Sequence, residues 1–210
     1  MNEVTPTSFT WYELDVVNFE VGYKAAMNAI DERAQSTEER VRELFAIKPG
    51  EEFASTPDSQ SEEAPFDFWA EVGDEERETD QAADVILRSF LIGLYQLFER
   101  HATNWVPSKK GENHLEKVNA FLTTKGFNPN MAAIGELKLV ANALKHGAGE
   151  SANRLFAERP DMFEVDQETD QSFEPSERNL AVTRLDFERY LRAVRQLGPR
   201  ARRPWDAFPV

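Results

Sequence analysis

Residues 81–105 carry two apolar rows at helical spacing, and this pattern constrains the fold most strongly. One row consists of Ile86, Phe90, Leu94 and Leu97, and the other consists of Leu87, Leu91, Tyr95 and Phe98. A helix that is apolar over most of its circumference must be surrounded by other elements. We therefore expect a central helix with Phe90, Leu94 and Leu97 inside. Pro107 is expected to end it, because proline cannot continue a helix.

Other helical patterns flank this segment. Apolar residues recur with helical period in residues 11–34, 112–124 and 130–146, and shorter helices are predicted for residues 151–158 and 184–197. Ser151 is expected to cap the first short helix, and Thr183 with Asp186 is expected to form a capping box for the last. Gly147 is expected to end the helix over residues 130–146, since glycine commonly follows a helix.

The predicted fold class is all-α, a helical bundle of four to five main helices with an acidic irregular insertion and a C-terminal tail. The predicted parts are the N-terminal helix of the bundle at residues 1–35, the insertion at 36–80, the main helical bundle at 81–198 and the tail at 199–210. A minor hairpin is expected between residues 163–165 and 180–183.

The insertion is defined by its charge. Residues 36–80 contain 15 acidic and 4 basic residues, together with several prolines and glycines. Aromatic residues interrupt the acidic run, so we expect residues 66–70 to dock onto the folded body. Residues 50–64 are expected to be mobile and to be cut first by proteases.

Composition excludes several classes of function. The sequence has no cysteine, which removes disulfides, thiol catalysis and cysteine-ligated metal sites. Its three histidines lack metal-ligand spacing, and no phosphate-binding loop or dinucleotide motif is present, so neither a metal nor a cofactor is expected. No apolar stretch approaches the ~20 residues of a membrane span. With no secretory signal visible, a cytoplasmic location without membrane association is predicted.

The most specific pattern is a polar strip on the helix over residues 130–146. Lys138, Asn142 and His146 are spaced by four residues, which places them on one helix face with Lys145 beside them. Lysine and asparagine can hold a phosphodiester, and histidine can transfer protons near neutral pH. The strip therefore predicts His146 and Asn142 as catalytic residues and Lys138 and Lys145 as phosphate ligands. The alternative is a solvated face in which His146 interacts with the helix dipole.

The segment that carries this strip, residues 137–147, resembles the HEPN superfamily (higher eukaryotes and prokaryotes nucleotide-binding), and residues 90–101 are similar to bacterial proteins of that helical type. The resemblance implies a small helical bundle that forms a dimer, and many members are RNA-cutting toxins or defence effectors. The family's motif is an arginine, then four to six residues, then the histidine. Here no arginine lies at that distance, and Lys138 is the nearest basic residue on the strip. Noncatalytic members also exist, so cleavage and binding both stay open.

Two other charged groups are candidates. Glu99, Arg100 and His101 lie together at the end of the central helix, either as a secondary site or as an ordinary surface charge group. Seven arginines lie within residues 184–203, where they could bind nucleic acid or neutralise the protein's own acidic residues. The net charge of −14 favours self-neutralisation, because it opposes attraction to a polyanion.

The sequence thus predicts a HEPN-like protein of a bacterial toxin or defence system with metal-independent RNA cleavage or RNA binding. The alternative is a noncatalytic protein–protein interaction or regulatory module that uses the bundle and the insertion. The expected partners are a second copy of the protein, RNA and a protein encoded nearby.

Overall fold

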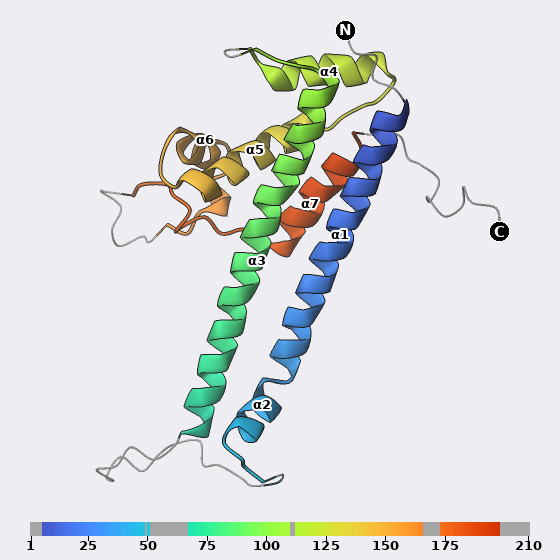
Figure 1. Ribbon diagram of the computed structural model, residues 1–210. Helices are drawn as coiled ribbons and strands as arrows, with labels where there is room; N and C mark the ends of the chain where they lie inside the picture. The colour runs from blue at the N-terminus through green and yellow to red at the C-terminus, as the bar shows by residue number, and fades with distance from the viewer. Residues whose placement is uncertain (1–5, 49, 51–66, 110–111, 166–172, 198–210) are drawn as a thin grey trace, which may run out of the picture. The chain divides into compact units, whose positions relative to one another are not determined.

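The computed structural model describes residues 6–48, 50, 67–109, 112–165 and 173–197. The elements, drawn in Figure 1, are α1 (Pro6–Gln35), α2 (Thr37–Leu44), α3 (Phe68–Trp105), α4 (His114–Thr124), α5 (Met131–His146), α6 (Glu150–Glu158), the 3-10 turn η1 (Pro160–Met162) and α7 (Arg184–Arg195). Over these ranges no strand occurs, and a single antiparallel bridge between Phe163 and Leu180 stands where the minor hairpin was expected. The all-α prediction is confirmed.

The protein divides into two compact units. Unit 1 comprises Met1–Tyr23 and Leu87–Val210, and unit 2 comprises Lys24–Ile86. Helices α1 and α3 each supply one segment to unit 1 and one to unit 2. This division differs from the predicted parts, because the two boundaries lie inside the long helices rather than at residues 35 and 80.

The α3 segment of unit 1 is buried much as its two apolar rows predict. Leu91 and Leu94 are fully buried, and Leu97 is nearly so. Phe90 is only half-buried, but its ring meets those of Phe19 and Tyr23 of α1 at centroid distances of 5.2 and 5.4 Å. The central-helix prediction therefore holds for this part of the protein.

Helix α7 packs against α1 within unit 1. The hydroxyl of Tyr12 in α1 donates a hydrogen bond of 2.6 Å to the carbonyl oxygen of Val194 in α7. The ring of Tyr23 stacks on that of Phe187, with centroids 3.8 Å apart. All four residues are buried, so α7 completes the core that α1 and α3 begin.

Local capping signals explain several helix ends in unit 1. Thr183 and Asp186 form the predicted capping box at the start of α7. Gly147 ends α5 with a φ of 74°, as expected for a residue that follows a helix. The prediction for Ser151 is wrong: Gly149 is the residue before α6, and Ser151 lies inside that helix.

A guanidinium fixes the segment that precedes α7. Arg88 of α3 donates hydrogen bonds to the carbonyl oxygens of Glu177 and Leu180, at 2.6 and 2.8 Å. The side chain of Glu177 lies directly against Gly147, where an added Cβ would be 2.7 Å from its carboxylate oxygen. The end of α5 and the segment before α7 are therefore closely packed.

The prediction of an irregular insertion at residues 36–80 is wrong in two places. Residues 37–44 form α2, and α3 begins at Phe68 rather than near residue 81. Within unit 2, Val41, Phe68 and Val72 form a small buried cluster with Ile47 packed against it. The expected docking of residues 66–70 is met by Phe68, whereas Trp69 is exposed and residue 66 lies outside the described residues.

Ion pairs between helices offset the repulsion among the acidic residues of unit 2. The carboxylate of Glu75 in α3 accepts from Arg33 of α1 at 3.1 Å and from Arg40 of α2 at 2.9 Å. Arg33 also donates to the hydroxyl of Thr79. Such tertiary pairing allows helices where local charge alone predicts an irregular segment. The predictions for residues 51–64 and for the tail at 199–210 lie outside the described residues.

Replacing the fully buried Leu94 tests the core of unit 1. We expect Leu94→Ala to lower the free energy of unfolding by about 2–5 kcal/mol, through lost apolar burial and the cavity left behind. Val21, which is 62 % exposed in α1, is the control, and Val21→Ala should change it by less than about 0.5 kcal/mol. Urea unfolding measures both. Equal effects would contradict the packing described for α3.

A pair of glycine substitutions tests the end of α5. Gly147→Ala should destabilise the protein by about 1–3 kcal/mol, because its backbone conformation suits glycine and the new methyl would meet Glu177. Gly135→Ala, in the middle of α5 with nothing within 4 Å of the added Cβ, should instead stabilise it by about 1 kcal/mol. Thermal melts would refute this account if both changes moved stability in the same direction.

Candidate functional site

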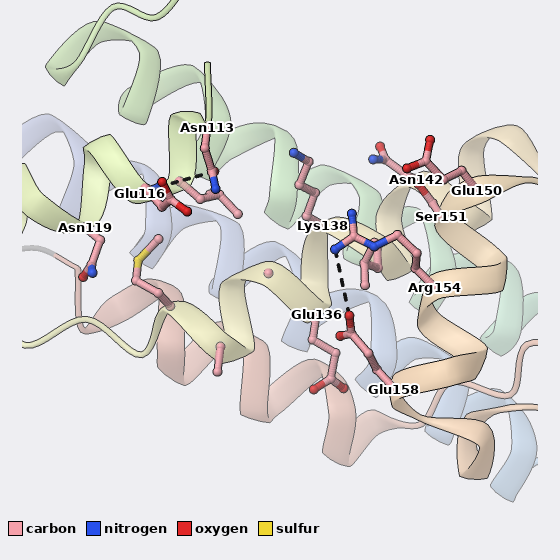
Figure 2. A pocket seen from close by; sticks show the side chains of 15 residues that line it. Asn113, Glu116, Asn119, Glu136, Lys138, Asn142, Glu150, Ser151, Arg154 and Glu158 are labelled. Atoms are coloured by element: carbon pink, nitrogen blue, oxygen red, sulfur yellow. Dashed lines mark hydrogen bonds and ion pairs between the residues drawn. The ribbon is translucent and has the colours of Figure 1, made fainter. Parts of the chain in front are cut away.

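Three helices of unit 1, α4, α5 and α6, line a groove of about 620 Å³. Figure 2 shows the groove from close by. The lining residues are Asn113, Leu115, Glu116, Asn119, Met131, Ala132, Gly135, Glu136, Lys138, Leu139, Asn142, Glu150, Ser151, Arg154 and Glu158. The groove is thus bordered by amide, carboxylate, cationic and apolar side chains together.

The sequence of α5 explains why the groove is open. Asn130 caps the helix by accepting a hydrogen bond from the backbone N–H of Ala133 at 3.2 Å. Ile134 and Leu137 are fully buried, which turns the opposite face of α5 towards the groove. On that face Ala132 and Gly135 have small or absent side chains, so space remains between α5 and its neighbours.

Only two of the four residues of the predicted polar strip on α5 border the groove. Lys138 and Asn142 line the groove. Lys145 and His146 are exposed in the last turn of α5 and are not among the lining residues. No side chain among the described residues hydrogen-bonds to His146, although a proton-transferring histidine is normally oriented by such a partner. The four residues therefore do not converge on one space.

Arg154 is a groove residue that the sequence pattern did not single out. It lies on α6, and its Nη2 atom is 3.9 Å from a carboxylate oxygen of Glu158 four residues later. In Figure 2 its guanidinium reaches from α6 towards α5, where Lys138 and Asn142 border the same space. The only sequence signal was an i,i+4 pair of opposite charge, which is common on any exposed helix.

Glu136 forms the best-connected polar cluster of the groove wall. Its carboxylate accepts hydrogen bonds from Arg189 Nη1 at 3.0 Å and from the hydroxyl of Tyr190 at 2.7 Å, both on α7. It also accepts from Arg159, which lies between α6 and η1. This side chain is only 14 % exposed, so two guanidiniums neutralise a largely buried charge. The cluster connects α5 with α7 and the start of η1.

These contacts change two pKa values. Burial alone would raise the pKa of Glu136, but the hydrogen bonds from Arg189 and Tyr190, with the positive charges of Arg189 and Arg159, lower it overall. Burial and then the adjacent carboxylate raise the pKa of Tyr190. Glu136 is therefore ionised and Tyr190 is neutral near pH 7, which suits a fixed structural role.

Carboxylates outnumber cations among the remaining groove residues. Glu116, Glu150 and Glu158 are exposed at its border, against the cations of Lys138 and Arg154. Glu136 adds no net attraction for a cation, because Arg159 and Arg189 already neutralise it. A polyanion entering the groove would therefore meet three acidic side chains.

The secondary candidates lie elsewhere in unit 1, and Asp15 of α1 joins two of them. Its Oδ2 atom is 2.9 Å from His101 Nε2 and 2.8 Å from Arg100 Nη2. His101 is buried, and its ring packs edge-on against that of Tyr12, with centroids 5.1 Å apart. Sequence reasoning missed Asp15, because no local pattern links α1 with the end of α3. The arrangement orients His101 but buries its ring.

Glu99, the third secondary candidate, points to a different neighbour. It is exposed and accepts a hydrogen bond of 3.4 Å from the hydroxyl of Tyr95. Burial, followed by the charge of Glu99, raises the pKa of Tyr95. The structure thus brings Arg100 and His101 together on Asp15 and leaves Glu99 outside that cluster.

Two arginines of α7 pair with the protein's own acidic residues. Arg189 pairs with Glu136, and Arg195 Nη1 lies 2.7 Å from Glu20 of α1. Self-neutralisation is therefore observed for these two side chains. Residues 200–203, which hold the last arginines of the series, lie outside the described residues.

Metal-binding and membrane-spanning features are absent from the described ranges. There, no group of three or more histidine, aspartate and glutamate side chains could hold a metal ion. None of the helices in those ranges has the length and apolar character needed to cross a membrane.

No protein-family model, curated protein or solved structure matches this sequence. The resemblance to the HEPN superfamily therefore stays a prediction, and the function must be proposed from the groove itself.

The Glu136 cluster gives a pH-dependent prediction. Because the folded-state pKa of Glu136 is lowered, its stabilisation is complete above its unfolded pKa of about 4.3 and is lost as the pH falls through the folded value. Glu136→Gln should cost about 2 kcal/mol at pH 7, since hydrogen bonds to charged groups are lost. As the pH falls below the unfolded pKa of about 4.3, the melting temperatures of variant and parent should progressively converge.

Glu150→Gln is the matched control, because Glu150 is exposed at the border of the same groove. Its melting temperature should follow that of the parent protein at each pH. A constant gap between Glu136→Gln and the parent from pH 7 to pH 3 would contradict the role assigned to the ionised carboxylate.

Proposed function

We propose that this protein is a noncatalytic interaction module that binds a segment of another protein in the groove between α4, α5 and α6. The observation that carries the proposal is the composition of the groove lining. The lining combines apolar side chains such as Met131 and Leu139 with the amides of Asn119 and Asn142, around about 620 Å³ of space. A mixed apolar and polar lining suits a peptide, whose backbone and side chains present both kinds of group.

The charge of the groove supports a protein ligand over a nucleic acid. Glu116, Glu150 and Glu158 would repel successive phosphates, and the net charge of −14 would weaken their long-range attraction. A peptide can place a neutral or basic side chain beside each carboxylate, so it avoids this repulsion.

The second candidate is RNA binding or metal-independent RNA cleavage by a HEPN-like protein of a bacterial toxin or defence system. Lys138, Asn142 and Arg154 favour it, because they border one space and could hold a phosphate. It ranks second because His146, the predicted acid/base, lies outside the groove lining and has no orienting partner among the described residues.

Site-specific photo-crosslinking tests the proposal. A benzophenone amino acid replaces Ala132, which is exposed within the groove, and in a control it replaces Ala157, which is exposed on α6 outside the lining. In cells that produce the protein, we expect a discrete protein adduct from position 132 and not from 157. Mass spectrometry then identifies the crosslinked segment, which is synthesised as a peptide.

The peptide's affinity decides whether the adduct is specific. Gly135→Leu would fill the groove, so it should weaken binding by at least about tenfold, or about 1.4 kcal/mol. Gly73→Leu, at an equally open helix position in unit 2, should leave the affinity unchanged. Equal affinities for the two variants would refute the groove as the binding site.

A nuclease assay separates the second candidate. Under the proposal, purified protein with EDTA leaves single-stranded and structured RNA intact. RNA cleavage in EDTA that His146→Ala reduces by about 10²–10⁴-fold, with an unchanged melting temperature, would replace the proposal with the catalytic function.

A further inference from the structure

We infer that Lys138, Asn142 and Arg154 form an anchor for a single carboxylate group of the bound segment. The inference rests on the proposed function and adds the chemistry of the ligand. The three side chains offer an ammonium, an amide N–H₂ and a guanidinium, all of which donate hydrogen bonds to a carboxylate. Nothing in the sequence pattern alone assigned Arg154 to this set.

Helix geometry brings the three donors together. Lys138 and Asn142 are four residues apart on α5, which places their Cβ atoms roughly 5–6 Å from each other on one face. Arg154 approaches the same space from α6 (Figure 2). Donors from two packed helices can therefore surround a small group without any change in the backbone.

The cations of this corner are incompletely neutralised. Lys138 forms no ion pair with any residue that the structure describes. Among the described residues Arg154 pairs with Glu158 alone, and that pair is both long, at 3.9 Å, and more than half exposed on each side. An exposed pair of this kind contributes little, so Arg154 can exchange it for a ligand at small cost.

The neighbouring acids limit the charge of the ligand. Figure 2 shows Glu150 beside Asn142, Glu158 pairs with Arg154, and Glu136 is already neutralised by its two arginines. Because Lys138 has no ion pair with a described residue and the pair of Arg154 is long, this corner can hold one negative charge with good hydrogen bonds, whereas the nearby carboxylates would repel a phosphate dianion more strongly. A carboxylate therefore fits this corner better than a phosphate does.

Two parts of a protein can supply that carboxylate, its C-terminus and an acidic side chain. N-acetyl-alanine represents the first, and the α-amide of N-acetyl-glutamate represents the second. N-acetyl-alanine amide is the uncharged control, and inorganic phosphate and a short oligouridylate represent the second candidate function. All are titrated into the full-length protein at constant ionic strength, with the Asn142 side-chain N–H₂ signals followed by NMR.

We expect saturable shifts at Asn142 with one of the two carboxylates, with a Kd on the order of 1–10 mM for so small a probe. Lys138→Met and Arg154→Met should each weaken that binding at least fivefold. Lys145→Met, which removes an exposed lysine of the same helix outside the groove, should change it less than twofold. The carboxylate that binds more tightly identifies the source.

Three results would overturn the anchor: equal shifts with the uncharged amide, no effect of Lys138→Met, or tighter binding of phosphate or oligouridylate than of either carboxylate. The last would favour the RNA function. If the carboxylates fail while Gly135→Leu still blocks the crosslinked peptide, the anchor is wrong and the interaction function stands. If the groove variants also leave peptide binding intact, both proposals fall.

Discussion

The carboxylate of Glu136 is the interaction on which the groove depends. It lies on α5, holds Arg189 and Tyr190 of α7, and holds Arg159 at the start of η1. Removing this one group would take an acceptor from each of the three partners and break their link to α5, although Arg159 would keep Asp161 and Arg189 would keep Asp186 at 3.5 Å. Glu136 also borders the groove. Helix α5, which carries Lys138 and Asn142, is therefore held in place by ionic contacts as well as by apolar packing.

Features that depend on neighbouring residues in the sequence could be predicted from it. The double apolar row of α3, the Thr183–Asp186 capping box and the glycine after α5 are all local, and the structure contains each of them. The helices within residues 36–80 were missed because their support is tertiary. In the sequence Glu75 is one acidic residue among many, and only the fold shows that it pairs with Arg33 of α1 and Arg40 of α2.

The candidate site shows the same limit. A spacing of four residues correctly placed Lys138 and Asn142 on one face of α5. It could not show how far along α5 the groove with α4 and α6 extends. His146 is one turn beyond the groove, and Arg154 enters it from α6. Asp15 and His101 are 86 residues apart in the sequence, and no pattern within α1 or α3 predicts that they are in contact.

The bond between Tyr12 and Val194 sets an order of events during synthesis. Its two residues are 182 positions apart, so a ribosome adding about 5–20 residues per second makes the acceptor roughly 10–40 s after the donor. Unit 2, whose Arg33 and Thr79 are 46 positions apart, has its partners far earlier. Throughout that interval the apolar face of the first helix lacks α7, and it would need either transient non-native contacts or a chaperone to cover it.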